Sequence, residues 1–248
     1  MRSLLAASLL FPFPSIALGG ATVIVPVAED ESVLSSSPDK NYSDNMNRGG
    51  LFVGSDGTDC ISRFYLKFHL PSDLAAKQIA SATLLATYLD DFDREDNGVH
   101  RIHYVASDDW SEKSITWDNQ PGPTFGTPEA TFDAAAFVPG KEVKWDLTEV
   151  VKRELEMDRT LSLMFAAGNE GTGRANRNWE YFPEHELDPA GAFRLSLVTT
   201  LSVGSGGGPV PVPLPPAVWP AAITLAGAVG LMAQRRIKRR SARSDATE

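Results

Sequence analysis

The sequence predicts an all-β fold, an antiparallel β-sandwich with one short helix, followed by a transmembrane helix near the C-terminus. Three observations support this. Short segments alternate apolar and polar side chains, turn-rich stretches separate these segments, and apolar residues fall at helical spacing in one segment of the main body. Strands do not alternate with long helices, which excludes a parallel α/β architecture.

The clearest strand runs from Ser62 to Leu70, where the even positions are apolar and Arg63, Lys67 and His69 occupy odd positions. Because successive side chains of a strand point to opposite faces, this segment is predicted to be half-buried. Three valines from Val23 to Val27 open the domain, and Pro26 places that first strand at a sheet edge. Further strands are predicted over 82–88, 161–165 and 193–197.

Turn-rich segments at 35–50 and 118–127 separate the strands, as expected of an antiparallel sandwich. A short helix is predicted after Asp146, which can cap it, with Glu149 three residues later. The apolar residues at helical spacing are Leu147, Val150, Val151 and Leu155. We expect this helix to cover one end of the sandwich.

Both ends of the chain indicate export. Residues 1–20 combine Arg2, an apolar run and small residues, which predicts a secretory signal peptide. The body is predicted at 21–202, a Gly/Pro linker at 203–216, a membrane helix at 217–233 and a basic cytoplasmic tail at 234–248. The 17 uncharged residues of the membrane helix would rise about 25 Å, just enough to cross a bilayer.

The basic cluster after this helix would keep the tail in the cytoplasm and the body outside. It consists of Arg235, Arg236, Lys238, Arg239 and Arg240. We therefore expect an inner-membrane intermediate that becomes a cell-surface or extracellular protein.

The linker ends in Val212-Pro213-Leu214-Pro215-Pro216, which resembles the VPLPA-type sorting signal of exosortase substrates in Gram-negative bacteria. Pro216 stands where that signal has alanine. The resemblance implies that an exosortase-type protease cuts near the motif and that the body passes to the surface. The alternative is a single-pass anchor that is never cut.

Composition narrows the possible partners. Residues 21–202 carry a net charge of about −14, which excludes nucleic-acid binding because phosphates require Lys and Arg. Cys60 is the sole cysteine, so no intrachain disulfide can form. We expect no cofactor other than structural Ca²⁺, which an exported acidic domain meets at millimolar concentration.

Two acidic stretches are candidate calcium sites. Asp91 and Asp93 belong to the carboxylate-rich run 90–98, although this run lacks the glycine of a calcium loop and equally suits a solvated acidic loop. Glu29 and Asp30 near the opening strand are the second candidate, by analogy with calcium-stabilised sandwich modules.

Several phrases in the body resemble the DNRLRE-type domain, which is related to archaeal disaggregatase repeats and to family 96 carbohydrate-binding modules. The most distinctive is WSEKSITWDNQP at Trp110–Pro121, similar to W-S-E-x-S-x-T-W-N-N-x-P. Others are LFVG from Leu51, RFYLKF from Arg63, SATL from Ser81 and WDLTEVV from Trp145. The resemblance implies a jelly-roll-like sandwich associated with extracellular polysaccharide.

Aromatic rings can stack on sugars, and Trp179 and Tyr181 lie in a polar segment that also supplies Arg177 and Asn178. These four residues are the candidate carbohydrate site, and a packed loop is the alternative. The sequence has no nucleophile elbow, P-loop or zinc motif, and its four histidines, His69, His100, His103 and His185, are predicted at the surface.

We therefore predict a secreted, surface-sorted, non-catalytic module that binds polysaccharide or serves in the extracellular matrix. The alternatives are a small polysaccharide-degrading enzyme, which would need a suitably spaced carboxylate pair, and a stalk module that contacts only proteins.

Overall fold

The computed structural model describes residues 20–43, 50–55, 60–92, 99–122, 127–168, 170 and 178–200. The chain divides into two compact units, 1–202 and 203–248, and all the described residues belong to the first. The predicted linker with its sorting motif, the membrane helix, the basic tail and residues 1–19 of the signal peptide lie outside the described residues. Within the described ranges, no helix is long and apolar enough to cross a bilayer.

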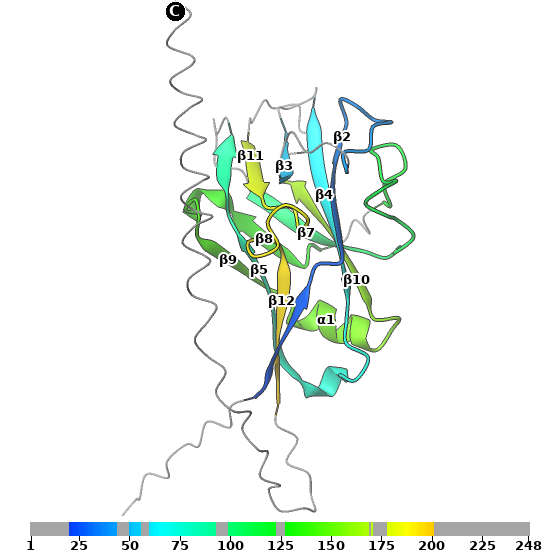
Figure 1. Ribbon diagram of the computed structural model, residues 1–248, viewed down its shortest axis with the longest axis vertical. Helices are drawn as coiled ribbons and strands as arrows, with labels where there is room; N and C mark the ends of the chain where they lie inside the picture. Colours follow the sequence, from blue (N-terminus) through cyan, green and yellow to red (C-terminus); the bar gives the residue numbers. More distant parts are fainter. Residues whose placement is uncertain are drawn as a thin grey trace, which may run out of the picture. The chain divides into compact units, whose positions relative to one another are not determined.

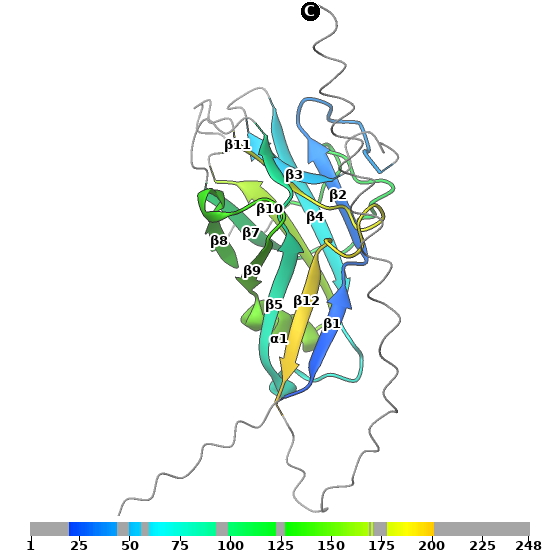
Figure 2. The ribbon, with the colours of Figure 1, turned by 60° about the vertical axis from the view of Figure 1, so that its left-hand side comes forward.

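The described residues form two antiparallel β-sheets, which confirms the predicted all-β sandwich (Figures 1 and 2). The smaller sheet has the order β1 (Thr22–Pro26), β12 (Arg194–Thr199), β5 (Ile79–Thr87) and β9 (Glu142–Asp146). The larger sheet has the order β6 (Asp90–Phe92), β11 (Asn178–Phe182), β3 (Leu51–Ser55), β4 (Ile61–His69), β10 (Thr160–Ala167), β7 (Val99–Val105) and β8 (Ala130–Asp133), and β2 (Glu29–Leu34) also pairs with β4.

The alternation of apolar side chains correctly predicts the central strand β4. Phe64, Leu66 and Phe68 are fully buried between the sheets. The edge position predicted from Pro26 is also confirmed, because β1 pairs only with β12 in the smaller sheet.

Aromatic rings from both sheets fill the centre of the core. Phe64 of β4 stacks on Phe165 of β10 with ring centroids 4.3 Å apart. Trp145 of β9 and Phe193, which directly precedes β12, pack on Phe165 from the smaller sheet. Their ring centroids lie 5.6 Å and 5.3 Å from that of Phe165. This close packing of rings explains why Trp145 is only 5% exposed.

The predicted short helix is α1 (Thr148–Leu155), near the lower end of the sandwich in Figure 1. Asp146 accepts hydrogen bonds from the backbone N–H of Thr148 at 2.9 Å and from its hydroxyl at 2.6 Å. Asp146 therefore satisfies one amide of the first turn, whereas Glu149 pairs with Lys152 instead of completing a capping box. Two 3₁₀ turns, η1 (Ala76–Gln78) and η2 (Ala134–Ala136), complete the elements in the described part.

The prediction of surface histidines is wrong for two of the four. His100 is fully buried and stacks on Phe132 with centroids 5.2 Å apart, and His103 is only 6% exposed. His100 and His103 are three residues apart in β7, so their side chains point to opposite faces of the sheet. Both faces of β7 are covered, which the local sequence does not reveal. Burial and the charge of Arg101 lower the pKa of His103.

Candidate functional site

An aromatic face lies on the outer side of β3 and β11. We give this name to Phe52, Trp179 and Tyr181. In β11, Glu180 and Phe182 are fully buried and point inward, so Trp179 and Tyr181 point outward and are half-buried. The alternation of the strand thus turns two of the predicted carbohydrate-binding residues to the same side.

Pairing across the two strands holds these rings together. Phe52 lies opposite Tyr181 in the register of β3 and β11, and the two rings stack 5.6 Å apart with an interplanar angle of 27°. Trp179 lies 6.3 Å from Phe52 at 49°. Phe52 is only 3% exposed, so it is the buried member of the three rings and packs against both half-buried ones.

Two further side chains border the aromatic face. Leu34 and Tyr42 pack in the same apolar cluster, and the ammonium group of Lys40 lies 4.6 Å from the Tyr42 ring centre. Arg177 lies outside the described residues, and only the backbone of Asn178 is described. The described part of the predicted site is therefore its aromatic component.

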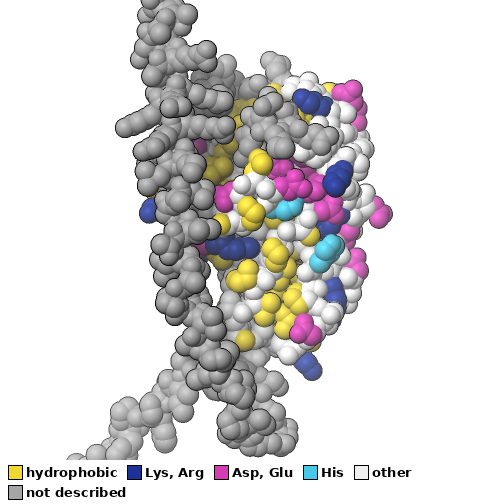
Figure 3. Space-filling view, viewed as in Figure 1, with side chains coloured by type: hydrophobic (Ala, Val, Ile, Leu, Met, Phe, Trp, Pro, Cys, Tyr) yellow, Lys and Arg dark blue, Asp and Glu magenta, His cyan; other side chains and the backbone are white. Residues whose placement is uncertain are grey.

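A second group of polar side chains, the acidic cluster, is assembled from three separate segments. We define it as Asp30 and Glu31 of β2, Glu112, Glu184 and His185. Asp30, Glu112 and His185 each have one potential ligand atom that lies within 4.8 Å of those of the other two. Acidic side chains gather beside a histidine on the face shown in Figure 3.

Asp30 is the best-satisfied carboxylate of the acidic cluster. It is 1% exposed, and it accepts the backbone N–H of His185 at 3.0 Å on one oxygen. Its other oxygen lies 2.8 Å from Nδ1 of His185. The hydrogen bond to Asp30 raises the pKa of His185 to about 9, so this imidazole is a cation at neutral pH.

The other acids of the cluster are crowded. Burial, together with repulsion from Glu184, Asp30 and Glu112, raises the pKa of Glu31 to about 8. Burial and the charge of Asp30 raise the pKa of Glu184 to about 7. Burial also raises the pKa of Glu112. The site therefore resists holding all its carboxyl groups charged without a compensating positive charge.

Glu29, predicted as a calcium ligand, is occupied by other contacts. Although burial acts to raise it, the pKa of Glu29 is lowered by hydrogen bonds from Lys67 at 2.8 Å and from the backbone N–H of Glu112 at 3.0 Å. Asp30 is the member of that predicted pair that belongs to the acidic cluster. Of the other predicted pair, Asp91 lies in β6 with only its backbone described, and Asp93 lies outside the described residues.

The WSEKSITWDNQP segment covers the outer face of the larger sheet. Trp110 and Ile115 are buried against Tyr65 and Met164, which point outward from β4 and β10. The indole N–H of Trp110 donates to the Ser162 hydroxyl at 3.1 Å. The most distinctive phrase of the sequence thus has a structural role that the sequence alone did not indicate.

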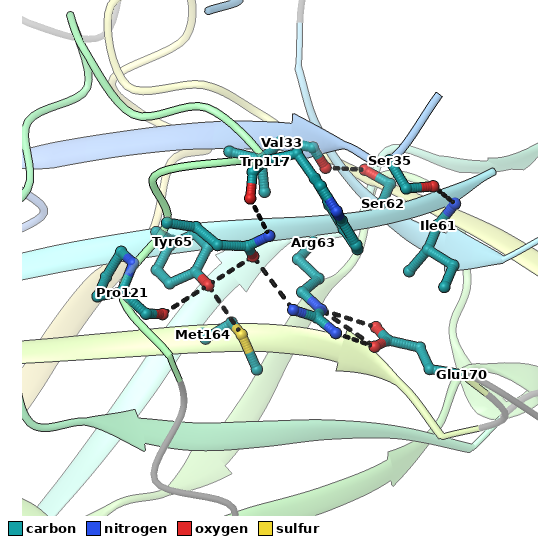
Figure 4. A network of polar contacts seen from close by, with 11 residues as sticks. Val33, Ser35, Ile61, Ser62, Arg63, Tyr65, Trp117, Pro121, Met164 and Glu170 are labelled. Carbon is teal, nitrogen blue, oxygen red and sulfur yellow. Dashed lines mark hydrogen bonds and ion pairs between the residues drawn. The ribbon is translucent and has the colours of Figure 1, made fainter. Parts of the chain in front are cut away.

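A polar network fastens the far end of this segment (Figure 4). Arg63 donates to both oxygens of Glu170, at 3.2 and 3.0 Å from Nε, and its guanidinium lies 4.7 Å from the Trp117 ring centre. The side-chain oxygen of Gln120 accepts from Arg63 at 3.2 Å and from the Tyr65 hydroxyl at 2.8 Å. Arg63 therefore stabilises the position of the WSEKSITWDNQP segment on the sheet.

Comparison with known families agrees with this architecture. The model of carbohydrate-binding module family 96 matches residues 21–184. The chain belongs to carbohydrate-binding module family 96. No curated protein matches it.

The family 96 match spans β1 to β11 and includes the whole aromatic face and most of the acidic cluster. His185 lies one residue beyond it. Membership supports a binding module with a carbohydrate partner, as the resemblance implied.

Sequence reasoning missed the acidic cluster because its members are far apart in the chain. Glu112 and Glu184 are separated from Asp30 by several strands, and no spacing rule links them. The one available signal was the acidic residue of the W-S-E phrase, which supplies Glu112.

Proposed function

We propose that this family 96 module binds polysaccharide on the aromatic face, without catalysis, as a protein displayed outside the cell. The observation that supports this most directly is the outward pair Trp179 and Tyr181, backed by the buried Phe52. Half-buried rings held rigidly by a sheet offer flat apolar surfaces to the C–H faces of sugar rings at little cost in conformational entropy.

The rest of the proposal concerns delivery. The signal peptide, the VPLPA-like motif at 212–216 and the membrane helix would bring the body to the cell surface through an exosortase-type protease. A jelly-roll connectivity for the sandwich and a role in the extracellular matrix belong to the same proposal.

Affinity electrophoresis and calorimetry of the full chain against soluble neutral and anionic polysaccharides test the binding site. Trp179→Ala and Tyr181→Ala should each weaken binding about two- to ten-fold, the loss expected from one aromatic contact of about 0.5–1.5 kcal/mol. Circular dichroism should show both variants folded.

Trp117→Ala is the matched control, because Trp117 is also a half-buried tryptophan outside the larger sheet but belongs to the Arg63 network. It should keep the affinity of the wild type. Equal loss in all three variants, or unchanged binding in Trp179→Ala and Tyr181→Ala, would place the sugar elsewhere.

A further inference from the structure

Residues 35–43, which follow β2, contact both the WSEKSITWDNQP segment and the apolar cluster of the aromatic face. Within this stretch only Tyr42 is buried, at 9% exposed, and it packs in one cluster with Leu34 and Phe52. The two outer rings of the aromatic face pack against the same cluster. The surroundings of these rings therefore depend on how residues 35–43 are held.

Asn41 holds this stretch with every hydrogen bond that its side chain can form. Its Nδ2 donates to the backbone carbonyls of Glu112 and Ile115, both at 2.7 Å. Its Oδ1 accepts from the backbone N–H of Ser43 at 3.2 Å and from the Ser43 hydroxyl at 2.5 Å. An asparagine amide has two donors and two acceptor lone pairs, so its capacity is used completely. The two carbonyls can only accept, which fixes the orientation of the amide.

The carbonyls that Asn41 contacts belong to a well-anchored part of the WSEKSITWDNQP segment. Ile115 is 1% exposed and packs on the outer face of the larger sheet. A second contact joins the same two stretches, from the backbone N–H of Asp118 to the carbonyl of Pro38 at 2.9 Å. Of the two attachments, Asn41 is the one directly beside Tyr42 in the chain.

We propose that Asn41 is a positioning residue of the carbohydrate site. By fastening residues 35–43 to the WSEKSITWDNQP segment, it keeps Tyr42 in the cluster on which the outer rings pack, so the aromatic face is ordered before a sugar arrives. An ordered face loses less conformational entropy on binding. Aspartate, which lacks the donors, cannot make the contacts of Asn41. This inference rests on the proposed function.

The first test measures affinity, with the purified full chain and with a soluble β-glucan and polygalacturonate as neutral and anionic probes. Asn41→Asp keeps the oxygen that faces Ser43 and places a second oxygen against two carbonyl oxygens, so residues 35–43 should detach. Affinity should fall about two- to ten-fold, the cost of ordering one further side chain on binding. Ser43→Ala is the matched control, because it keeps both Nδ2 contacts and should retain the wild-type affinity.

Cys60 reports on the same contact without any sugar. It packs against the apolar cluster of the aromatic face, and its Sγ lies 3.2 Å from the hydroxyl of Ser36. It is the sole cysteine, so a thiol reagent labels one site. Release of residues 35–43 in Asn41→Asp should speed this labelling at least about five-fold, the factor that corresponds to one lost hydrogen bond.

Two further variants separate positioning from a general loss of stability. Val151 of α1 is fully buried, and α1 lies at the end of the sandwich away from β3 and β11 (Figures 1 and 2). Val151→Ala should lower the Tm but change neither the affinity nor the labelling of Cys60. If Asn41 acts through Tyr42, the double variant of Asn41→Asp and Tyr42→Ala should bind no more weakly than Tyr42→Ala alone.

The outcomes distinguish this inference from the proposed function. Unchanged labelling of Cys60 in Asn41→Asp and in Asn41→Ala, which removes the donors without adding repulsion, would overturn the positioning role. Faster labelling with wild-type affinity would also overturn it, since the contact would then be structural only. If Trp179→Ala weakens binding and Asn41→Asp does not, the proposed function stands and this inference fails. Absence of binding by the wild type to both polymers would refute the proposed function, and the positioning role with it.

Discussion

At the scale of single residues, the least expected feature is a carboxyl group inside the sandwich. Glu180 of β11 is fully buried, its carboxylate lies 3.7 Å from Nε2 of His100, and the hydroxyl of Tyr88 donates to it. A strand that must point Trp179 and Tyr181 outward points Glu180 inward by the same alternation. The outer aromatic pair is therefore coupled to a polar group that the core must accommodate.

Replacing Tyr88 by phenylalanine tests how much the hydrogen bond from its hydroxyl to Glu180 contributes to stability. Tyr88→Phe removes the hydroxyl donor and leaves a fully buried Glu180 oxygen less satisfied, so the free energy of unfolding should fall by about 1–3 kcal/mol. Urea denaturation followed by circular dichroism measures it. Tyr42→Phe removes a hydroxyl at the border of the aromatic face and should change stability by less than about 0.5 kcal/mol. Equal stability of Tyr88→Phe and wild type would show that Glu180 does not depend on this donor.

Among the helices and strands, the sequence predicts those that have a local periodic pattern, but it does not predict how distant segments pack on one another. The strands around 62–70, 161–165 and 193–197 and the helix after Asp146 are visible because alternation and helical spacing are local properties. Sequence patterns do not reveal which outward sheet face is covered. The burial of His103 and the packing of Trp110 therefore emerged only from the structure.

The candidate site divides in the same way. The sequence placed Trp179 and Tyr181 in one polar segment, and the structure adds that the segment is the strand β11, in which residues two apart share a face. The acidic cluster joins residues about 80 and 150 positions apart in the chain, and only tertiary packing brings them together.

The WSEKSITWDNQP segment, Trp110–Pro121, which covers the outer face of the larger sheet, allows a separate prediction. Trp110 is 6% exposed, its indole donates to Ser162, and its ring lies 4.5 Å from the Lys67 ammonium. Trp110→Ala should lower the free energy of unfolding by about 3–5 kcal/mol, the usual cost of removing a buried aromatic side chain. Denaturant titration measures the loss.

Lys113→Ala provides the control in the same segment, since Lys113 is exposed and its truncation should be nearly neutral. If Trp110→Ala lowers the free energy of unfolding as little as Lys113→Ala does, the WSEKSITWDNQP segment contributes little to the stability of the sheet.

At the scale of the whole molecule, the chain combines an acidic body with a basic end. The body carries about −14, whereas five Lys and Arg residues lie between 235 and 240. This asymmetry suits a protein whose body faces outward and whose tail faces the cytoplasm. The Gly/Pro composition of 203–216, between these two regions, is that of a linker.

If the VPLPA-like motif is a sorting signal, the mature protein ends near it. Intact-mass measurement of protein recovered from the cell surface should then show loss of residues beyond the motif, including Arg235–Arg240. Replacing Pro213 and Pro215 by alanine should block cutting, because it changes the motif itself, and the full-length form should accumulate in the membrane. Replacing Pro209 and Pro211 by alanine, upstream of the motif, should leave cutting intact. Recovery of surface protein that still carries the basic tail would contradict sorting, and the hydrophobic helix would then serve as a permanent anchor that holds the binding module at the membrane.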